Sequence, residues 1–373
     1  MASDQPPQIA GSRWKKMLTI FLRLGITFAF FYYIFVHLIH FHDEILLLNG
    51  QKIQGSIESI LPGGVSIKAK AGLQFFENEK IQKNKDGLLC IKIGFLSIFK
   101  KLKISLFVSF VLLFIINSFI SALRFQWLLA AQNIIIVYFQ AWKVTMMGLF
   151  FGNFLPGFTG GDLVKAYYIT KESAVIAKSV VTVLVDRIVG LASLIVLVAI
   201  ILLFQFGKSE FYLASLLIFS CLACLLLGIA FFFFCPKAWV YKRKNFIFRI
   251  LQIFYDYQDK KKILAHCFFI TFFIHIFTNI AIYGFALSLG ITTIPWYTYF
   301  IYGAIGFLLM ALPISLAGWG VGEAAYSLMF IKVGLAPEQA VVLSILVKIG
   351  QMIVSLIGGG VWLSLGISKK GKS

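Results

Sequence analysis

The chain has 373 residues, and its composition excludes a soluble globular protein. Hydrophobic residues make up 60% and charged residues 13%, whereas soluble domains have about 45–50% and about 25%. The mean hydropathy is +0.90. Lysine and arginine number 34 against 15 acidic residues, a net charge of +19. In a membrane protein such an excess marks cytoplasmic loops and anionic lipid contacts, and no aromatic-basic module typical of nucleic-acid binding is visible.

Apolar runs predict the membrane-spanning segments. The first covers about 17–40 and lacks the short apolar region and cleavage site of a signal peptide. The other runs lie at about 104–130, 134–156, 176–205, 211–235, 263–289, 297–312 and 339–367. A full span needs about 20 apolar residues. The runs 134–156 and 297–312 differ from the rest, because each leads into a break that contains proline and glycine and then into a short amphipathic segment.

The charge of the loops predicts the topology. Segment 237–262 carries eight Lys or Arg and two Asp, so it is expected to be cytoplasmic together with the basic N-terminus and the tail SKKGKS. Eight full spans would place this segment outside. If 134–170 and 297–332 enter and leave the membrane on the same side, all three basic regions lie inside. We therefore expect an all-α polytopic membrane protein with about six full spans, two re-entrant broken helices and cytoplasmic termini. Alternatively, proline and glycine only kink ordinary spans.

The two breaks resemble each other weakly. Leu155-Pro156 is followed by two glycines and Asp162, and Leu312-Pro313 is followed by three glycines and Glu323. Because the two segments would enter from opposite faces, this pattern predicts an inverted repeat whose broken helices meet near the midplane.

A polar segment after the first run predicts a β domain. Asn49-Gly50 is a strong hairpin signal, and short alternating stretches such as VSIKAKA follow. We expect a small SH3-like barrel over 43–95, between an N-terminal segment with the first span (1–42) and the main transmembrane domain (96–373). By topology the insert lies outside, where it could dock an extracytoplasmic partner.

Ionisable residues at membrane depth are costly and mark functional sites. Six stand out, three anionic and three cationic: Asp162, Lys165, Asp186, Arg187, Glu323 and Lys348. One interpretation is a polar cavity, lined by cations and half-helix N-termini, that suits a phosphate or another anionic head group. The alternative is that the six residues form buried salt bridges that hold helices together, although such pairs seldom add net stability.

No enzyme signature is present, and neither a cofactor nor a metal site is indicated. The five cysteines lie mostly in apolar surroundings and read as packing residues. His275 and Asn279 are one turn apart on the run 263–289, which favours a hydrogen bond between helices. Proton coupling by His275 is the other interpretation.

Three ordered motifs resemble a known family. GNFLPGFTGGDLVKAYYI, SVVTVLVDRIVGL and LPISLAGWGVGEAAY are similar to the lysylphosphatidylglycerol synthetase/flippase transmembrane family, which includes the membrane half of the bacterial multiple peptide resistance factor. The resemblance covers about 100–370. It implies a flippase-like unit of the bacterial inner membrane without the aminoacyl-transferring domain. This sequence has Gly322 where the family usually has arginine. Together with Lys348, the positions that it carries over give the candidate head-group site: Asn153, Pro156, Gly160, Gly161, Asp162, Lys165, Asp186, Arg187, Pro313, Ser315, Gly318, Gly320 and Glu323.

These features predict a transporter that moves a lipid or lipid-linked head group between leaflets, without enzymatic activity. An integral-membrane enzyme acting on a lipid-linked sugar and a membrane scaffold that docks a partner through the β insert are the alternatives.

Overall fold

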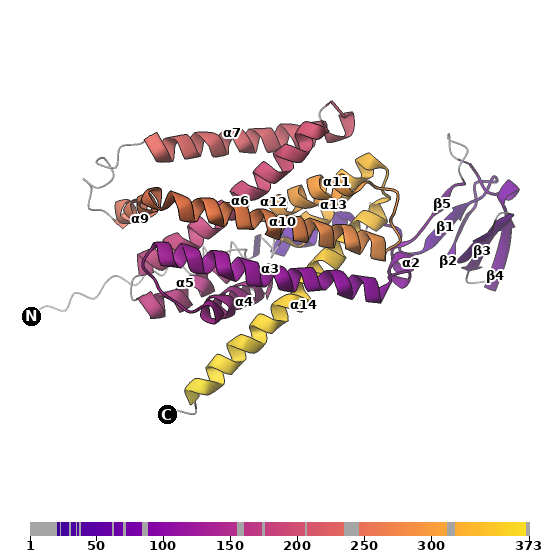
Figure 1. Ribbon diagram of the computed structural model, residues 1–373. Coiled ribbons are helices and arrows are strands. Elements are labelled where there is room, and N and C mark those ends of the chain that lie inside the picture. The colour runs from indigo at the N-terminus through magenta and orange to yellow at the C-terminus, as the bar shows by residue number, and fades with distance from the viewer. Residues whose placement is uncertain are drawn as a thin grey trace, which may run out of the picture.

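The protein is a bundle of long helices with a small β-sheet at one end (Figure 1). The computed structural model describes residues 21–22, 24–29, 31–34, 36, 39–61, 63–69, 72–83, 89–154, 160–173, 176–205, 207–234, 246–311 and 318–370.

Five helices within these ranges are long and apolar enough to cross a membrane. They are α3 (Ile104–Ala131), α6 (Ile176–Phe204), α7 (Tyr212–Phe234), α10 (Lys261–Ser288) and α14 (Pro337–Lys370). Helices suit these sequences because a bilayer offers no hydrogen bonds, so the backbone must satisfy its own polar groups. The polytopic all-α fold with a small sheet is therefore confirmed. Much of the first predicted span lies outside the described residues, but Ile34 packs in one cluster with Ala324 and Val341.

The first predicted break lies between α4 (Tyr138–Phe154) and α5 (Gly160–Ser173). The ammonium of Lys178, at the start of α6, donates to the carbonyl of Gln132, just after α3, at 3.3 Å. The end of α3 and the start of α6 therefore lie together, and the α4–α5 segment leaves and returns at one end of the bundle.

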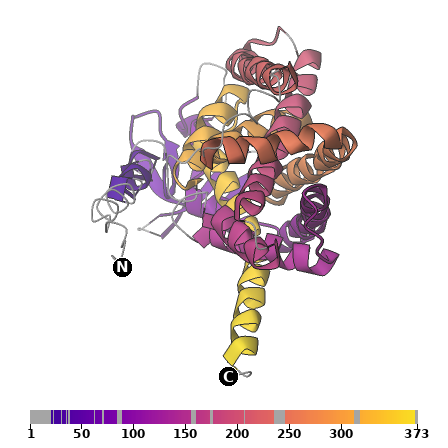
Figure 2. The same cartoon turned by 90° about the vertical axis from the view of Figure 1, so that its left-hand side faces the viewer.

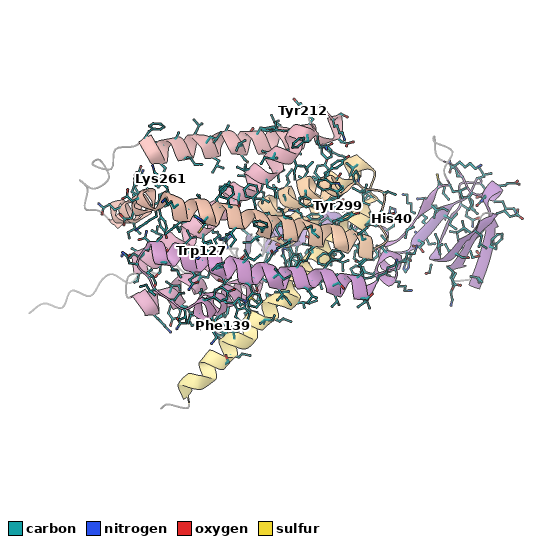
Figure 3. All side chains as sticks on the ribbon, in the orientation of Figure 1. His40, Trp127, Phe139, Tyr212, Lys261 and Tyr299 are labelled. Atoms are coloured by element: carbon teal, nitrogen blue, oxygen red, sulfur yellow. The ribbon has the colours of Figure 1, made fainter. Side chains whose placement is uncertain are left out.

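The second break follows α11 (Trp296–Thr298), a π-helical turn (Tyr299–Gly303) and α12 (Ala304–Ala311), and it precedes α13 (Val321–Phe330). Before this segment, the Ser288 carbonyl accepts a 2.9 Å bond from the backbone of Lys103. After it, Glu338 near the start of α14 contacts the His40 ring at 2.8 Å. Both contacts lie at the end of the bundle that carries the sheet (Figures 1 and 3).

The insert is a five-stranded antiparallel sheet in the order β4-β3-β2-β1-β5. Its strands are β1 (Asp43–Leu46), β2 (Lys52–Leu61), β3 (Gly64–Ala69), β4 (Gly72–Glu77) and β5 (Ile91–Lys92). After β4 the chain crosses to the other edge, where Ile81 pairs with Leu47. The apolar core is small and centres on Ile45, Val65 and Ile67. In β3, Val65 and Ile67 alternate with Ser66 and Lys68, as the sequence pattern VSIKAKA predicts.

A buried aspartate joins the sheet to the bundle. The Asp43 carboxylate accepts bonds from the backbone N–H of Ile57 at 2.6 Å, from that of Gly94 at 2.6 Å and from the Ser97 hydroxyl at 2.9 Å. Ser97 belongs to the short helix α2 (Phe95–Lys100). Three donors on one carboxylate fix the sheet to the start of the main helical domain.

The helices pack unevenly around the core. In both views α7 lies on the outside of the bundle, and the C-terminal part of α14 extends away from it (Figures 1 and 2). The amphipathic helix α9 (Phe246–Tyr255) lies at the end of the bundle opposite the sheet (Figure 1).

Candidate functional site

A cavity of about 300 Å³ lies inside the bundle. Its walls come from α3, α4, α10, α12 and α14, with Arg187 from α6. Among the described residues, five of those that line it carry an amide or a positive charge: Asn117, Asn153, Arg187, Lys348 and Gln351. The other lining residues include Phe114, Leu149 and Met310, so the cavity combines an apolar wall with a few polar side chains, as ligand sites commonly do.

Arg187 and Asp162 form an ion pair at the edge of this cavity. The Nε of Arg187, on α6, lies 2.5 Å from a carboxylate oxygen of Asp162, on α5. Their side chains are 31% and 20% exposed, more than the other ion pairs between the membrane helices. Because Arg187 also lines the cavity, a ligand that enters could contact the guanidinium.

A second ion pair cluster lies deeper and links three helices. Asp186 on α6 accepts from Arg124 on α3 at 2.8 Å and from Lys165 on α5 at 3.5 Å. The Lys165 ammonium also lies 5.0 Å from the centre of the Phe125 ring. The Asp186 side chain is 6% exposed, and those of its two partners are 11% and 13% exposed. This cluster suits a structural role better than direct contact with a ligand.

Arg124 was not among the site residues predicted from the sequence. The residue is the one basic or acidic residue in the apolar run 104–130, so the same rule that selected Asp186 applies to it. Its guanidinium also donates to the hydroxyl of Thr271 on α10 at 3.1 Å. Arg124 therefore extends the charged cluster to a fourth helix.

The second break brings Glu323 close to Lys348. Glu323 is fully buried, and its Oε2 accepts a 2.7 Å bond from the backbone N–H of Gly320. This bond caps α13, so the N–H of Gly320 serves the helix instead of a ligand. The Lys348 charge acts on Glu323, and its ammonium lies 5.1 Å from the centre of the Trp319 ring.

The glycines of the two motifs have different surroundings. A Cβ at Gly161 would lie 2.1 Å from the carbonyl oxygen of Gly148, so α4 and α5 touch through their backbones. Gly318 and Gly320 have φ values of 76° and 80°, which favour glycine. A Cβ at Gly318 would lie 3.1 Å from the Lys348 ammonium. Gly161 thus serves helix packing, and Gly318 lets Lys348 approach the backbone.

The candidate residues do not form a single site. The central cavity gathers Asn153, Arg187 and Lys348, with Asp162 paired to Arg187. Gly160 instead lines a separate hollow of about 320 Å³ with Leu163. Three further candidates lie outside the described residues: Pro156, Pro313 and Ser315.

His275 connects two helices. Its Nε2 lies 3.0 Å from the Gly190 carbonyl and 3.1 Å from the Ser193 hydroxyl, both on α6. Asn279 donates back to the carbonyl of His275 at 2.8 Å. These contacts are those of a helix-packing residue. In the part of the chain that the structure describes, no group of three His, Cys, Asp or Glu could hold a metal ion.

The charges favour an anion over a cation as the ligand. Among the described residues, four cations and three carboxylates belong to the cavity and the adjoining clusters: Arg124, Lys165, Arg187, Lys348, Asp162, Asp186 and Glu323. One positive charge is therefore in excess. The two cations that line the cavity come from different helices, so they could contact one phosphate group from two sides.

Comparison with known proteins places the chain in a family. The family model described as the lysylphosphatidylglycerol synthase TM region matches residues 94–359. This range contains the cavity and every described helix from α2 through most of α14. The whole sheet, which ends with β5 at Lys92, lies before it. No curated protein and no solved structure matches the chain significantly. The chain belongs to the family of the lysylphosphatidylglycerol synthase TM region.

Proposed function

We propose that the protein moves a lipid or lipid-linked head group between the leaflets of the bacterial inner membrane and has no enzymatic activity of its own. The membrane fold and the family support a lipid-related role. The proposed substrate has an anionic or phosphate-bearing head group, because the cations that line the cavity outnumber the carboxylates there.

The observation that carries this proposal is the joint position of Arg187 and Lys348. Both line the same cavity of about 300 Å³, although 161 positions separate them in the sequence. Lys348 is 4% exposed. Because a buried cation is costly in a membrane, placing two beside one polar cavity supports a site for an anion.

The proposed route uses the two broken helices. The α4–α5 segment leaves and returns at one end of the bundle, and the α11–α13 segment does so at the other, which supports two inverted re-entrant elements. Gly152 and Met310, from the first and second element, both line the cavity. A site contributed by both elements could be reached from either side in turn. We place the N- and C-termini and α9 on the cytoplasmic side.

Reconstituted liposomes test the proposal. A fluorescent phosphatidylglycerol, quenched from one leaflet, reports its movement in the presence of the full-length protein. Arg187→Gln and Lys348→Gln are each expected to slow lipid movement by about tenfold to a hundredfold. This factor corresponds to the loss of one charge-assisted hydrogen bond to the head group. The matched control is Lys332→Gln, because Lys332 is exposed and does not line the cavity.

A further variant separates binding from packing. Arg187→Gln leaves Asp162 without its ion pair partner, so the double variant Arg187→Gln/Asp162→Asn is measured beside it. Slow lipid movement in Arg187→Gln and in the double variant, with unchanged melting temperatures, supports the site. Lipid movement restored in the double variant contradicts it, and so does full movement in both Arg187→Gln and Lys348→Gln. Turnover of a lipid-linked sugar donor by the same liposomes would instead support the enzyme alternative.

A further inference from the structure

A second and larger cavity lies on the other side of α6. It has a volume of about 640 Å³ and is formed by α6, α7, α9, α10 and the turn before α10. We call this cavity the lateral groove. Of the described residues that line it, nearly all are apolar, and Tyr257 and Lys261 are the polar exceptions. It shares no residue with the central cavity, where Arg187 provides the α6 wall.

The lateral groove lies beside the middle of α7, whose two ends pack on the bundle. Ala214 and Ile218, in its first half, belong to the main apolar core. Near its other end, the Phe232 ring lies 5.0 Å from the Phe254 ring of α9. Ribbon views show α7 running along the outside of the bundle, next to α9 and α10 (Figures 1 and 2). A Cβ at Gly228 of α7 would meet no atom within 4 Å. The α7 wall therefore faces open space that another apolar group can fill.

The groove has the depth of one lipid leaflet. From Lys261 to Phe269 it follows α10 for about 12 Å, and from Val185 to Val196 it follows α6 for about 17 Å, at about 1.5 Å per residue. The hydrocarbon core of a bilayer is about 30 Å thick, so one leaflet takes about 15 Å. An acyl chain of one leaflet fits this depth.

The polar end of the groove matches a lipid head group. Lys261 lies at the end of the bundle that is opposite His40 and the sheet (Figure 3). Lys260 and Lys262, its neighbours, are exposed, and the amphipathic helix α9 lies at the same end (Figure 1). Such basic, amphipathic elements lie at the membrane surface and attract anionic lipids.

We propose that the lateral groove binds an anionic phospholipid, with one acyl chain between α6, α7 and α10 and the phosphate at Lys261. A second copy of the chain is a poorer fit. Docking through α7 would cover its outer surface, where Leu227 and Phe231 are 71% and 67% exposed, and neither residue lines the groove. The lateral groove is thus a lipid site that does not depend on transport through the central cavity.

Photochemical labelling tests this site directly. The full-length protein is placed in phosphatidylcholine nanodiscs that contain a trace of phosphatidylglycerol with a photoactivatable group halfway along one acyl chain. Labelled peptides are then mapped by mass spectrometry. We expect label on the groove-lining faces of α6, α7 and α10. Gly228→Phe should reduce it about tenfold, because its ring excludes about two methylene groups from the site.

Two controls make the result decisive. Leu227→Phe adds a larger ring on the outer surface of α7 and should leave the label unchanged. Lys261→Gln should reduce labelling by phosphatidylglycerol about tenfold and leave labelling by a phosphatidylcholine probe unchanged. Gly228→Leu repeats the test with a smaller side chain if the Phe variant melts at a lower temperature.

Three outcomes overturn the proposal: equal labelling of Gly228→Phe and the unmodified protein, equal loss with both probes in Lys261→Gln, and cross-links between two copies through α7. None of these outcomes involves lipid movement, so a failure here is distinct from a failure of the proposed transport function.

Discussion

The guanidinium of Arg124 and the carboxylate of Asp186 lie 2.8 Å apart, although 62 positions separate them in the sequence. Lys165 approaches the other oxygen of the same carboxylate at 3.5 Å. The three residues come from α3, α6 and α5. The carboxylate therefore fixes the first broken helix pair against the long helices that flank it, and Arg187, the next residue on α6, lines the central cavity.

Removing Arg124 should destabilise the protein. In Arg124→Gln the buried Asp186 keeps only the longer contact to Lys165, and breaking a buried pair costs about 3–5 kcal/mol. We expect a clearly lower melting temperature in detergent. The double variant Arg124→Gln/Asp186→Asn should recover most of the loss. Lys100→Gln, at an exposed position, is the control. A double variant as unstable as the single one would show that the pair does not hold these helices.

Two glycine substitutions should have opposite effects. Gly161→Ala would put a methyl group 2.1 Å from the Gly148 carbonyl oxygen, so α4 and α5 must separate, and overpacking of this kind costs about 1–3 kcal/mol. In Gly228→Ala the new methyl group meets no atom within 4 Å. Because alanine favours a helix over glycine, this variant should be more stable, by up to about 1 kcal/mol in the free energy of unfolding. Melting temperatures of the two variants check this, and equal shifts would refute the close approach.

Protonation of Glu44 in acid should destabilise the sheet. Burial, the largest influence, favours the neutral form, but the bond from Gln54 and the charges of Lys52 and Lys92 outweigh it and lower the pKa of Glu44 below its ordinary value of 4.5. A lowered pKa in the folded state stabilises the fold above the ordinary value. This stabilisation is lost as the pH falls from 4.5 through the lowered pKa.

The measurement for Glu44 is hydrogen exchange of β1 and β2, corrected for the intrinsic effect of pH. Protection should fall in this acid range in the unmodified protein, and Glu44→Gln should lack that step because it cannot ionise. If the variant shows the same step, another group causes it.

Labelling from outside the cell should establish the topology. In a variant without native cysteines, a cysteine at Asn49 in the sheet should react with an impermeant thiol reagent in intact cells, and one at Lys260 before α10 should not. Both positions are exposed, so accessibility within the fold does not explain a difference. Labelling at position 260 but not at 49 would reverse our orientation, and labelling at both would contradict the spans between them.

The sequence alone determined the class of the protein and the approximate bounds of the long apolar helices. Apolar runs of span length require helices, because a bilayer cannot bond to the backbone, and α3, α6, α7, α10 and α14 appear where those runs lie. The turn signal at Asn49-Gly50 and the alternating apolar and polar residues likewise predicted the sheet that the structure contains. These signals are local, since each depends on residues within one segment.

Only the tertiary structure decided which charges meet. Asp162 and Lys165 are three positions apart on α5, a spacing that places them on one helix face. However, Asp162 pairs with Arg187 and Lys165 with Asp186. The partners lie on different helices, and helix rotation and crossing set their distances. The same holds for Gly161, whose tight contact with Gly148 comes from the crossing of α4 and α5. Spacing along the chain predicts contacts within a helix, whereas contacts between helices arise from packing, which the sequence pattern does not encode locally.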